Sequence, residues 1–339
     1  MEFFNNSNSF LDETLQNVSC HTSRRNFGHI EYVEKIYVVC NIINSALALA
    51  TALCNAIILW VIWRLPSLHT PSFVLLFNLA LSDFGVGVLA LPPYVIKKTM
   101  EIRLFRLERL SDAWNSALSI YCKSGLIADI FGTLFASTSY FFLVTISVER
   151  YQAISLHLRY NQVVTIRRTM LIAFFVWIFA TSMVIFRFTL ELKIVIKVYS
   201  LLIVTVVIVV HCNLKIAITL RRHTLQIASQ GISGSITAVG LTKFKKSMIT
   251  LCLIFGLLLI CYVPFAVSAL VFAFGIPAEV YITLMAISTS IVYLNSFLNP
   301  IVYCLRMGEI RAGVRATFAA VGSRCRQHVT AVMELSTRR

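Results

Sequence analysis

The sequence predicts an all-α membrane protein, a seven-transmembrane helix bundle with a short amphipathic eighth helix. Of its 339 residues, 58% are hydrophobic and only 13% are charged, whereas a soluble domain is roughly 25% charged. The apolar residues also gather in runs that can cross a hydrocarbon core of about 30 Å, which takes roughly 20 residues of helix. These two observations exclude a soluble nucleic-acid-binding protein and a disordered chain.

Seven apolar runs give the organisation of the chain. They lie at residues 35–64, 71–96, 122–148, 169–186, 197–215, 247–274 and 280–305. No internal repeat or low-complexity linker separates them, so we expect one membrane domain at 36–306 between a tail at 1–35 and a C-terminal region. Ile310, Val314 and Phe318 recur at helical spacing against Arg311 and Arg315. This predicts an amphipathic membrane-surface helix at 307–320, followed by a cytoplasmic tail at 321–339.

The distribution of charge predicts the orientation. The net charge is +15, and most Lys and Arg fall on the inner side when the N-terminus is placed outside, as the positive-inside rule requires. We therefore expect a multi-pass plasma-membrane protein with an extracellular N-terminus and a cytoplasmic C-terminus. The N-terminal tail has no apolar centre typical of a cleavable signal peptide. It carries two glycosylation sequons, at Asn5 and Asn17.

An ionisable residue, Asp83, interrupts the second apolar run within Asn78-Leu79-Ala80-Leu81-Ser82-Asp83. A charge at mid-membrane costs roughly 2.5–3.5 kcal/mol on insertion scales, so it indicates a function and a partner. Candidate partners in other runs are Asn55, Ser139, Asn295, Ser296 and Asn299. Their oxygens around one carboxylate could hold a Na⁺ ion or share a proton. A helix-packing hydrogen-bond network without an ion is the alternative.

Two further motifs indicate moving parts. Glu149-Arg150-Tyr151 stands at the inner end of the third run, where an adjacent acid and base can pair in one state and separate in another, or merely anchor the helix. Pro264 and Pro300 interrupt the sixth and seventh runs. Because proline removes one helix hydrogen bond, each predicts a bend, with neighbouring Asn side chains available to the freed carbonyl of the seventh.

Together these motifs resemble the rhodopsin-like class of G-protein-coupled receptors. The matching elements, in family order, are Asn55, the Leu79–Asp83 run, Glu149-Arg150-Tyr151, Trp177, Cys261-Tyr262-Val263-Pro264 and Asn299-Pro300-Ile301-Val302-Tyr303. The resemblance implies a receptor, not an enzyme, that transmits an extracellular ligand signal to a heterotrimeric G protein by conformational switching. The alternatives are a non-coupling or constitutively active receptor-like scaffold and, less favoured, a seven-helix transporter.

The resemblance also implies residue roles. Asp83, Ser139, Asn295 and Asn299 would form a sodium-linked network, Arg150 would contact the G protein, and Tyr303 would swing inward on activation. The partners would be a G protein, arrestin, membrane lipid and an unidentified extracellular ligand, with no nucleic acid. No cofactor is implied beyond an allosteric Na⁺. The ligand pocket would be lined by Asp129, Gly132, Thr133, Ala136, Tyr262, Phe265, Thr289 and Tyr293.

Several features depart from the family pattern. The second outer loop is short and lacks cysteine, as in the melanocortin and cannabinoid branches, so Cys122 would pair with Cys20, with Cys40 or with nothing. Tyr262 replaces the usual tryptophan, and its hydroxyl needs a partner. The first outer loop, at 97–121, is expected to be long. Cys325, beyond the amphipathic helix, is a palmitoylation candidate or a free thiol.

Overall fold

The computed structural model describes residues 30–107, 111–156, 159–189, 256–257, 259–268 and 278–320, together with single helical positions at 207, 211, 215, 218 and 323. Within these residues every regular element is a helix and no β-strand occurs. The all-α prediction is therefore confirmed. The 197–215 run lies mostly outside the described residues. The 247–274 run is described chiefly as a helix at 259–268.

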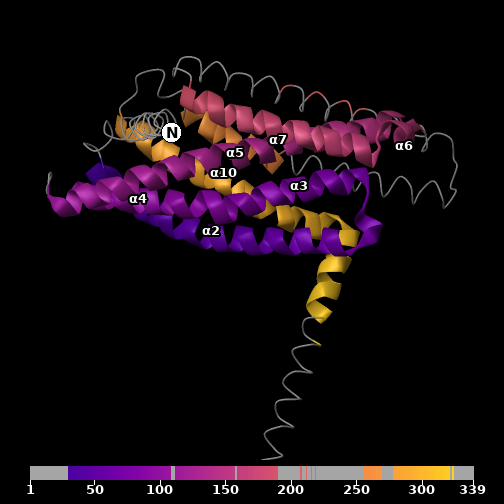
Figure 1. Cartoon of the computed structure of the whole chain (residues 1–339), viewed down its shortest axis with the longest axis horizontal. Helices are drawn as coiled ribbons and strands as arrows, with labels where there is room; N and C mark the ends of the chain where they lie inside the picture. Colours follow the sequence, from indigo (N-terminus) through magenta and orange to yellow (C-terminus); the bar gives the residue numbers. More distant parts are fainter. Residues whose placement is uncertain are drawn as a thin grey trace, which may run out of the picture.

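Long helices running side by side form the bundle (Figure 1). In the described part of the chain, five stretches are long and apolar enough to cross a membrane. They are supplied by α2 (Ile30–Arg64), α3 (Pro71–Gly85) continued by α4 (Leu91–Arg106), α5 (Asp112–Leu156), α7 (Ile166–Thr189) and α10 (Ala278–Arg306). Two short helical turns, η2 (Pro66–Leu68) and α6 (Tyr160–Val163), lie between α2 and α3 and between α5 and α7.

The regular α-helical backbone of the second span is interrupted where α3 passes into α4. A single π-helical turn, η3 (Val86–Ala90), joins the two helices. Pro92 and Pro93 follow at the start of α4. Neither proline has an N–H to donate, and each ring collides with the preceding turn of an ideal helix, so the backbone widens there. Pi turns of this kind are uncommon and tend to occur near functional sites.

The expectation of a long first outer loop was wrong. The chain stays helical to Arg106 and is helical again from Asp112, so α4 and α5 extend well past the apolar runs. The physical reason is packing between the two extensions, where Leu104 of α4 lies buried in one cluster with Ala117 and Tyr121 of α5. Hydropathy indicates where a helix leaves the hydrocarbon core, but it does not indicate where the helix ends.

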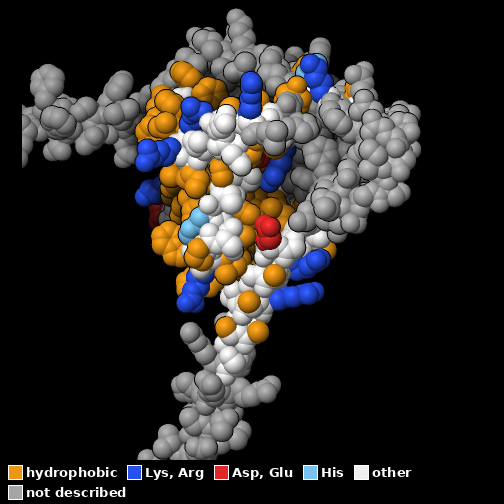
Figure 2. Space-filling model, turned by 90° about the vertical axis from the view of Figure 1, so that its right-hand side faces the viewer, with side chains coloured by type: hydrophobic (Ala, Val, Ile, Leu, Met, Phe, Trp, Pro, Cys, Tyr) orange, Lys and Arg blue, Asp and Glu red, His pale blue; other side chains and the backbone are white. Residues whose placement is uncertain are grey.

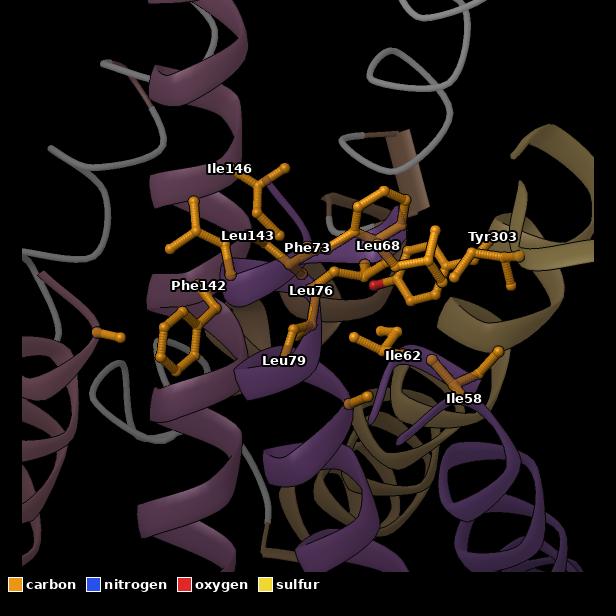
Figure 3. Close-up of a cluster of buried hydrophobic side chains, with 14 of the residues drawn as sticks. Ile58, Ile62, Leu68, Phe73, Leu76, Leu79, Phe142, Leu143, Ile146 and Tyr303 are labelled. Atoms are coloured by element: carbon orange, nitrogen blue, oxygen red, sulfur yellow. The ribbon is translucent and has the colours of Figure 1, made fainter. Parts of the chain in front are cut away.

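The half of the bundle that includes the inner core cluster, named for the predicted orientation, is packed around α3. Figure 3 shows side chains from α2, α3, α5 and α10 pointing toward one another, and they belong to one buried cluster that includes Ile58, Ile62, Phe73, Leu76, Leu79, Phe142, Leu143, Ile146 and Tyr303. Lipid supplies no hydrophobic drive between helices, so close van der Waals contact holds them together. At Gly87 the approach is so close that a Cβ would lie 2.7 Å from the backbone nitrogen of Ala52.

The segment expected as an amphipathic surface helix is helical at 308–320. It turns away from the end of α10 (Figure 1). Ile310 is completely buried, and a Cβ at Gly313 would lie 2.5 Å from Val61 of α2. Arg311, Arg315 and Phe318 are exposed. One face of this helix therefore packs on the bundle, and the opposite face combines basic and apolar groups.

Candidate functional site

Asp83 lies at the centre of the membrane-buried polar network. Its side chain is completely buried in α3. Ser139 of α5 donates a hydrogen bond to Oδ1 at 2.9 Å, and the amide nitrogen of Asn299 in α10 donates to Oδ2 at 2.7 Å. Both carboxylate oxygens are thus bonded, and three helices distant in the sequence meet at one side chain.

Asn55 compensates for the proline in α10. Pro300 has no N–H, so the carbonyl of Ser296, four residues earlier, lacks its helical partner. The amide nitrogen of Asn55 in α2 donates to that carbonyl at 3.1 Å and to the carbonyl of Thr51 at 3.0 Å. The freed carbonyl is therefore satisfied from another helix, and the expectation that neighbouring Asn side chains do this was wrong. Asn299 donates to Asp83 instead, and the amide nitrogen of Asn295 has no acceptor among the described residues.

Asn295 is a buried amide one helical turn before Asn299, on the same face of α10. It is 1% exposed, and neither its side-chain oxygen nor its nitrogen has a hydrogen-bond partner among the described residues. A buried polar group without a partner costs about 1–3 kcal/mol. The structure therefore gives the Asp83 network one unused oxygen acceptor and one unused donor nearby along α10.

The acidic member of Glu149-Arg150-Tyr151 is held by more groups than the sequence motif contains. Glu149 Oε1 accepts hydrogen bonds from the Ser72 hydroxyl, at 2.8 Å, and from the Tyr160 hydroxyl. Arg150 Nε lies 3.3 Å from Glu149 Oε2, an ion-pair contact without hydrogen-bond geometry. Tyr151 is half-buried and packs against the inner core cluster. Sequence reasoning missed Ser72 and Tyr160, because both lie outside the motif.

The Tyr160 phenol remains a donor at every physiological pH. Burial, the hydrogen bond to Glu149 and the nearby Glu149 charge together raise its pKa to about 12. A raised phenol pKa favours the neutral form that donates to the carboxylate. The Glu149 carboxylate is consequently fixed from α3 by Ser72 and from α6 by Tyr160, independently of Arg150.

Sequence reasoning also did not predict two other hydrogen bonds between helices. The indole nitrogen of Trp177 in α7 donates to the side-chain oxygen of Asn78 in α3 at 3.0 Å. Asn44 of α2 donates to Ser290 of α10, also at 3.0 Å. Each bond joins polar side chains that lie within apolar runs. Their polarity could have identified these residues from the sequence, but it could not have shown which of them bond to each other.

Near the other end of the bundle, predicted pocket residues from three elements meet. The Tyr262 hydroxyl donates to the carbonyl of Ala136 at 3.2 Å, which gives it the partner it needs. A Cβ at Gly132 would lie 3.1 Å from the Tyr293 hydroxyl, so α5 and α10 approach closely there. Asp129 pairs with Lys97 of α4 at 3.4 Å. The remaining predicted lining residues are half-buried: Thr133, Phe265 and Thr289.

Cys122 is disulfide-bonded and Cys40 is a free cysteine. Cys20 lies outside the described residues, so its pairing with Cys122 stays a prediction. Asn5, Asn17 and Cys325 also lie outside them. Pro264 and Pro300 both sit within helices, and the Tyr303 side chain is buried in the inner core. In the described part of the chain no cluster of three or more His, Cys, Asp or Glu could hold a metal ion.

Comparison with known proteins agrees with this arrangement. Residues 54–193 and 187–303 match the model of the 7 transmembrane receptor (rhodopsin family). The chain belongs to this family, and it is a G-protein-coupled receptor, a multi-pass membrane protein that couples an extracellular ligand to a G protein and is not an enzyme.

Individual relatives are distant. The chain is 23% identical to the adenosine receptor A2a of Homo sapiens over 307 residues, which cover 80% of this chain and 70% of that receptor. It is 25% identical to the melanocortin receptor 5 of Rattus norvegicus over 298 residues, covering 82% and 83% of the two chains. The adenosine receptor A3 of Ovis aries is 25% identical over 282 residues, with 76% and 82% covered.

The geometry around Asp83 predicts a reciprocal exchange. Asp83→Asn replaces one carboxylate oxygen by an NH₂ group, so one of the two donors on Asp83 loses its acceptor. The free energy of unfolding of the purified receptor should therefore fall by about 1–3 kcal/mol. Adding Asn299→Asp restores one donor and one acceptor, and should recover most of that loss. The measurement is thermal unfolding of both single variants and the double variant in detergent. Simple additivity of the two single losses would contradict the pairing.

Proposed function

We propose that this receptor switches through the contact between Glu149 and Arg150. The observation that carries the proposal is the position of Glu149, which Ser72 and Tyr160 hold by hydrogen bonds while Arg150 lies 3.3 Å away. The acid therefore stays in place when the arginine leaves. Arg150 is about one quarter exposed, and on release its guanidinium is available to the G protein. Pro264 and Pro300 provide the bends about which the sixth and seventh helices move, and the buried Tyr303 moves inward.

Arg150→Ala should reduce G-protein activation in cells about 10- to 100-fold at equal surface expression, because a hydrogen bond to a charged group contributes ~1.5–3 kcal/mol. Glu149→Gln, which weakens the hold on Arg150, should raise ligand-independent signalling. The control is Arg64→Ala, since Arg64 also lies at the inner end of a helix, where it lies over the Trp60 ring and forms no ion pair among the described residues. Equal activation of every G-protein family by wild type and Arg150→Ala would instead support a non-coupling scaffold.

We further propose that Asp83 binds an allosteric Na⁺ ion. Three features support an ion here: a buried carboxylate, the Ser139 hydroxyl on its Oδ1, and the unpartnered amide oxygen of Asn295 one turn along α10. Hard cations take oxygen ligands of these kinds. Asn55, Ser296 and Asn299 then hold the surrounding backbone and carboxylate. The competing function of the same residues is helix packing through hydrogen bonds alone.

Replacing external Na⁺ with N-methylglucamine should raise the basal signalling of wild type, because an ion bound at Asp83 stabilises the inactive state. The basal signalling of Asp83→Asn should not respond to the replacement. Ser290→Ala serves as a control, since Ser290 belongs to the separate bond with Asn44. If the basal signalling of wild type does not change when Na⁺ is replaced, the Na⁺ proposal is wrong, and helix packing is the only role left for these residues.

The extracellular ligand would bind between α4, α5, the helix at 259–268 and α10. Support comes from the meeting of Gly132, Ala136, Tyr262 and Tyr293, with Asp129 toward the outer end. Adenosine and melanocortin receptors, named for chemically different ligands, match this chain about equally. The comparisons therefore select no ligand class. The partly exposed ion pair between Asp129 and Lys97 leaves no uncompensated charge to attract a simple cation.

We propose a plasma-membrane location with the N-terminus outside and the C-terminus cytoplasmic. The arginines at the end of the bundle formed by α6 and the 308–320 helix support it, because inner loops carry the basic excess. Arrestin and acidic lipid would share this surface with the G protein. Epitope tags at the two ends of the chain should stain differently, the N-terminal tag in intact cells and the C-terminal tag only after permeabilisation. Staining of both tags in intact cells would overturn the orientation.

A further inference from the structure

A crevice of about 400 Å³ opens beside Glu149, between the inner ends of α5 and α7. This volume lies within the roughly 300–1,000 Å³ of small-molecule sites. Its walls are mainly apolar and include Leu75 of α3 and Val148 of α5, whereas Glu149, Gln152 and Arg168 supply the polar groups. None of these residues belongs to the ligand pocket or to the Asp83 network. The crevice is therefore a separate candidate site on the inner side of the receptor.

A second, mainly apolar hollow of about 280 Å³ lies next to the crevice, toward the middle of the membrane. The two hollows share Val144, Thr145 and Ile172, so they adjoin on the surface of the bundle, and together they are called here the α5–α7 furrow. Along α5 the furrow runs from Gln152 to Phe141, about 16 Å at 1.5 Å per residue. That length matches one leaflet, which is half of a hydrocarbon core of about 30 Å.

The polar end of the furrow carries the positive charge of Arg168, which forms no ion pair with any acid in the part of the chain that the structure describes. Arg168 Nη1 donates to the carbonyls of Gln162 and Val163, at 3.3 and 2.9 Å. A guanidinium has five N–H donors, and those on Nε and Nη2 meet no acceptor among the described residues, so they are available to a ligand. The Glu149 carboxylate, which would repel an anion, is already compensated by Arg150 and by two hydroxyl donors. Figure 2 shows other Lys and Arg side chains around this end of the molecule.

We propose that the α5–α7 furrow is a binding site for an acidic phospholipid of the inner leaflet. The phosphate oxygens of the headgroup bind Arg168, and one acyl chain lies along the furrow against Phe141, Phe175 and Phe179. The gradient from a cationic end to an apolar end across one leaflet matches such a lipid in charge and in length. Assignment to the inner leaflet rests on the orientation proposed above. Because Glu149 lines the same space, lipid occupancy and the Glu149–Arg150 contact are linked.

The test uses purified full-length receptor in vesicles of phosphatidylcholine that contain a photoactivatable phosphatidylserine with its reactive group on an acyl chain. Peptide mapping should find the label on the furrow segments of α5 and α7. A phosphatidylcholine probe with the same reactive chain should label these segments less. Arg168→Gln should reduce labelling by the serine lipid about fivefold, which corresponds to the ~1 kcal/mol that one basic side chain contributes near an acidic surface. It should not change labelling by the choline lipid.

Two matched variants separate the headgroup contact from the chain contact. Arg311→Gln removes an exposed arginine of the same end outside the furrow and should leave labelling unchanged. Ile172→Trp fills the furrow where its two hollows join, and should reduce labelling by both probes. Equal labelling of wild type by the two lipids, or labelling unaffected by Arg168→Gln, overturns the site. Labelling does not depend on signalling, so a receptor that fails the Arg150→Ala test can still pass this one.

Discussion

The cost of leaving a polar group without a partner in hydrocarbon governs the interior of this receptor. Water is not available there to replace a lost hydrogen bond, so partners on other helices stabilise the buried carboxylate and the carbonyl that proline leaves free. Asp83 receives one donor from α5 and one from α10, and the carbonyl freed by Pro300 receives Asn55 from α2. These bonds fix the relative positions of four helices. They also concentrate the connections at a few side chains, so that a change at one of them reaches all four.

At the Glu149 end of the bundle the same rule applies to an ion pair. Glu149 keeps its place because Ser72 and Tyr160 hold it from two directions, whereas Arg150 meets it through a looser ion-pair contact. Under the proposed switching, such a pair would be a two-state element whose equilibrium a partner can shift. The α5–α7 furrow adjoins this pair, so the acidic lipid proposed to bind there would lie next to it.

Much of the fold could be predicted from the sequence. The five spanning helices of the described residues fall where apolar runs occur, because crossing a bilayer requires about 20 apolar residues in a row. The identity of the central polar residues was also predictable, since an Asp83 or an Asn295 stands out in such a run. The ends of the helices were less predictable. Helices α4 and α5 continue beyond the apolar runs because their side chains pack on each other outside the hydrocarbon.

The sequence by itself determined that the chain is a helical membrane receptor and which polar residues matter, because hydropathy and motif order are local properties that folding does not alter. Only the tertiary structure decided which polar groups form hydrogen bonds with each other. That Asn55 serves the carbonyl of Ser296, that Tyr160 holds Glu149, and that α5 and α7 leave a furrow between them all depend on distances between segments far apart in the chain. Such distances follow from helix packing, which no single stretch of sequence encodes.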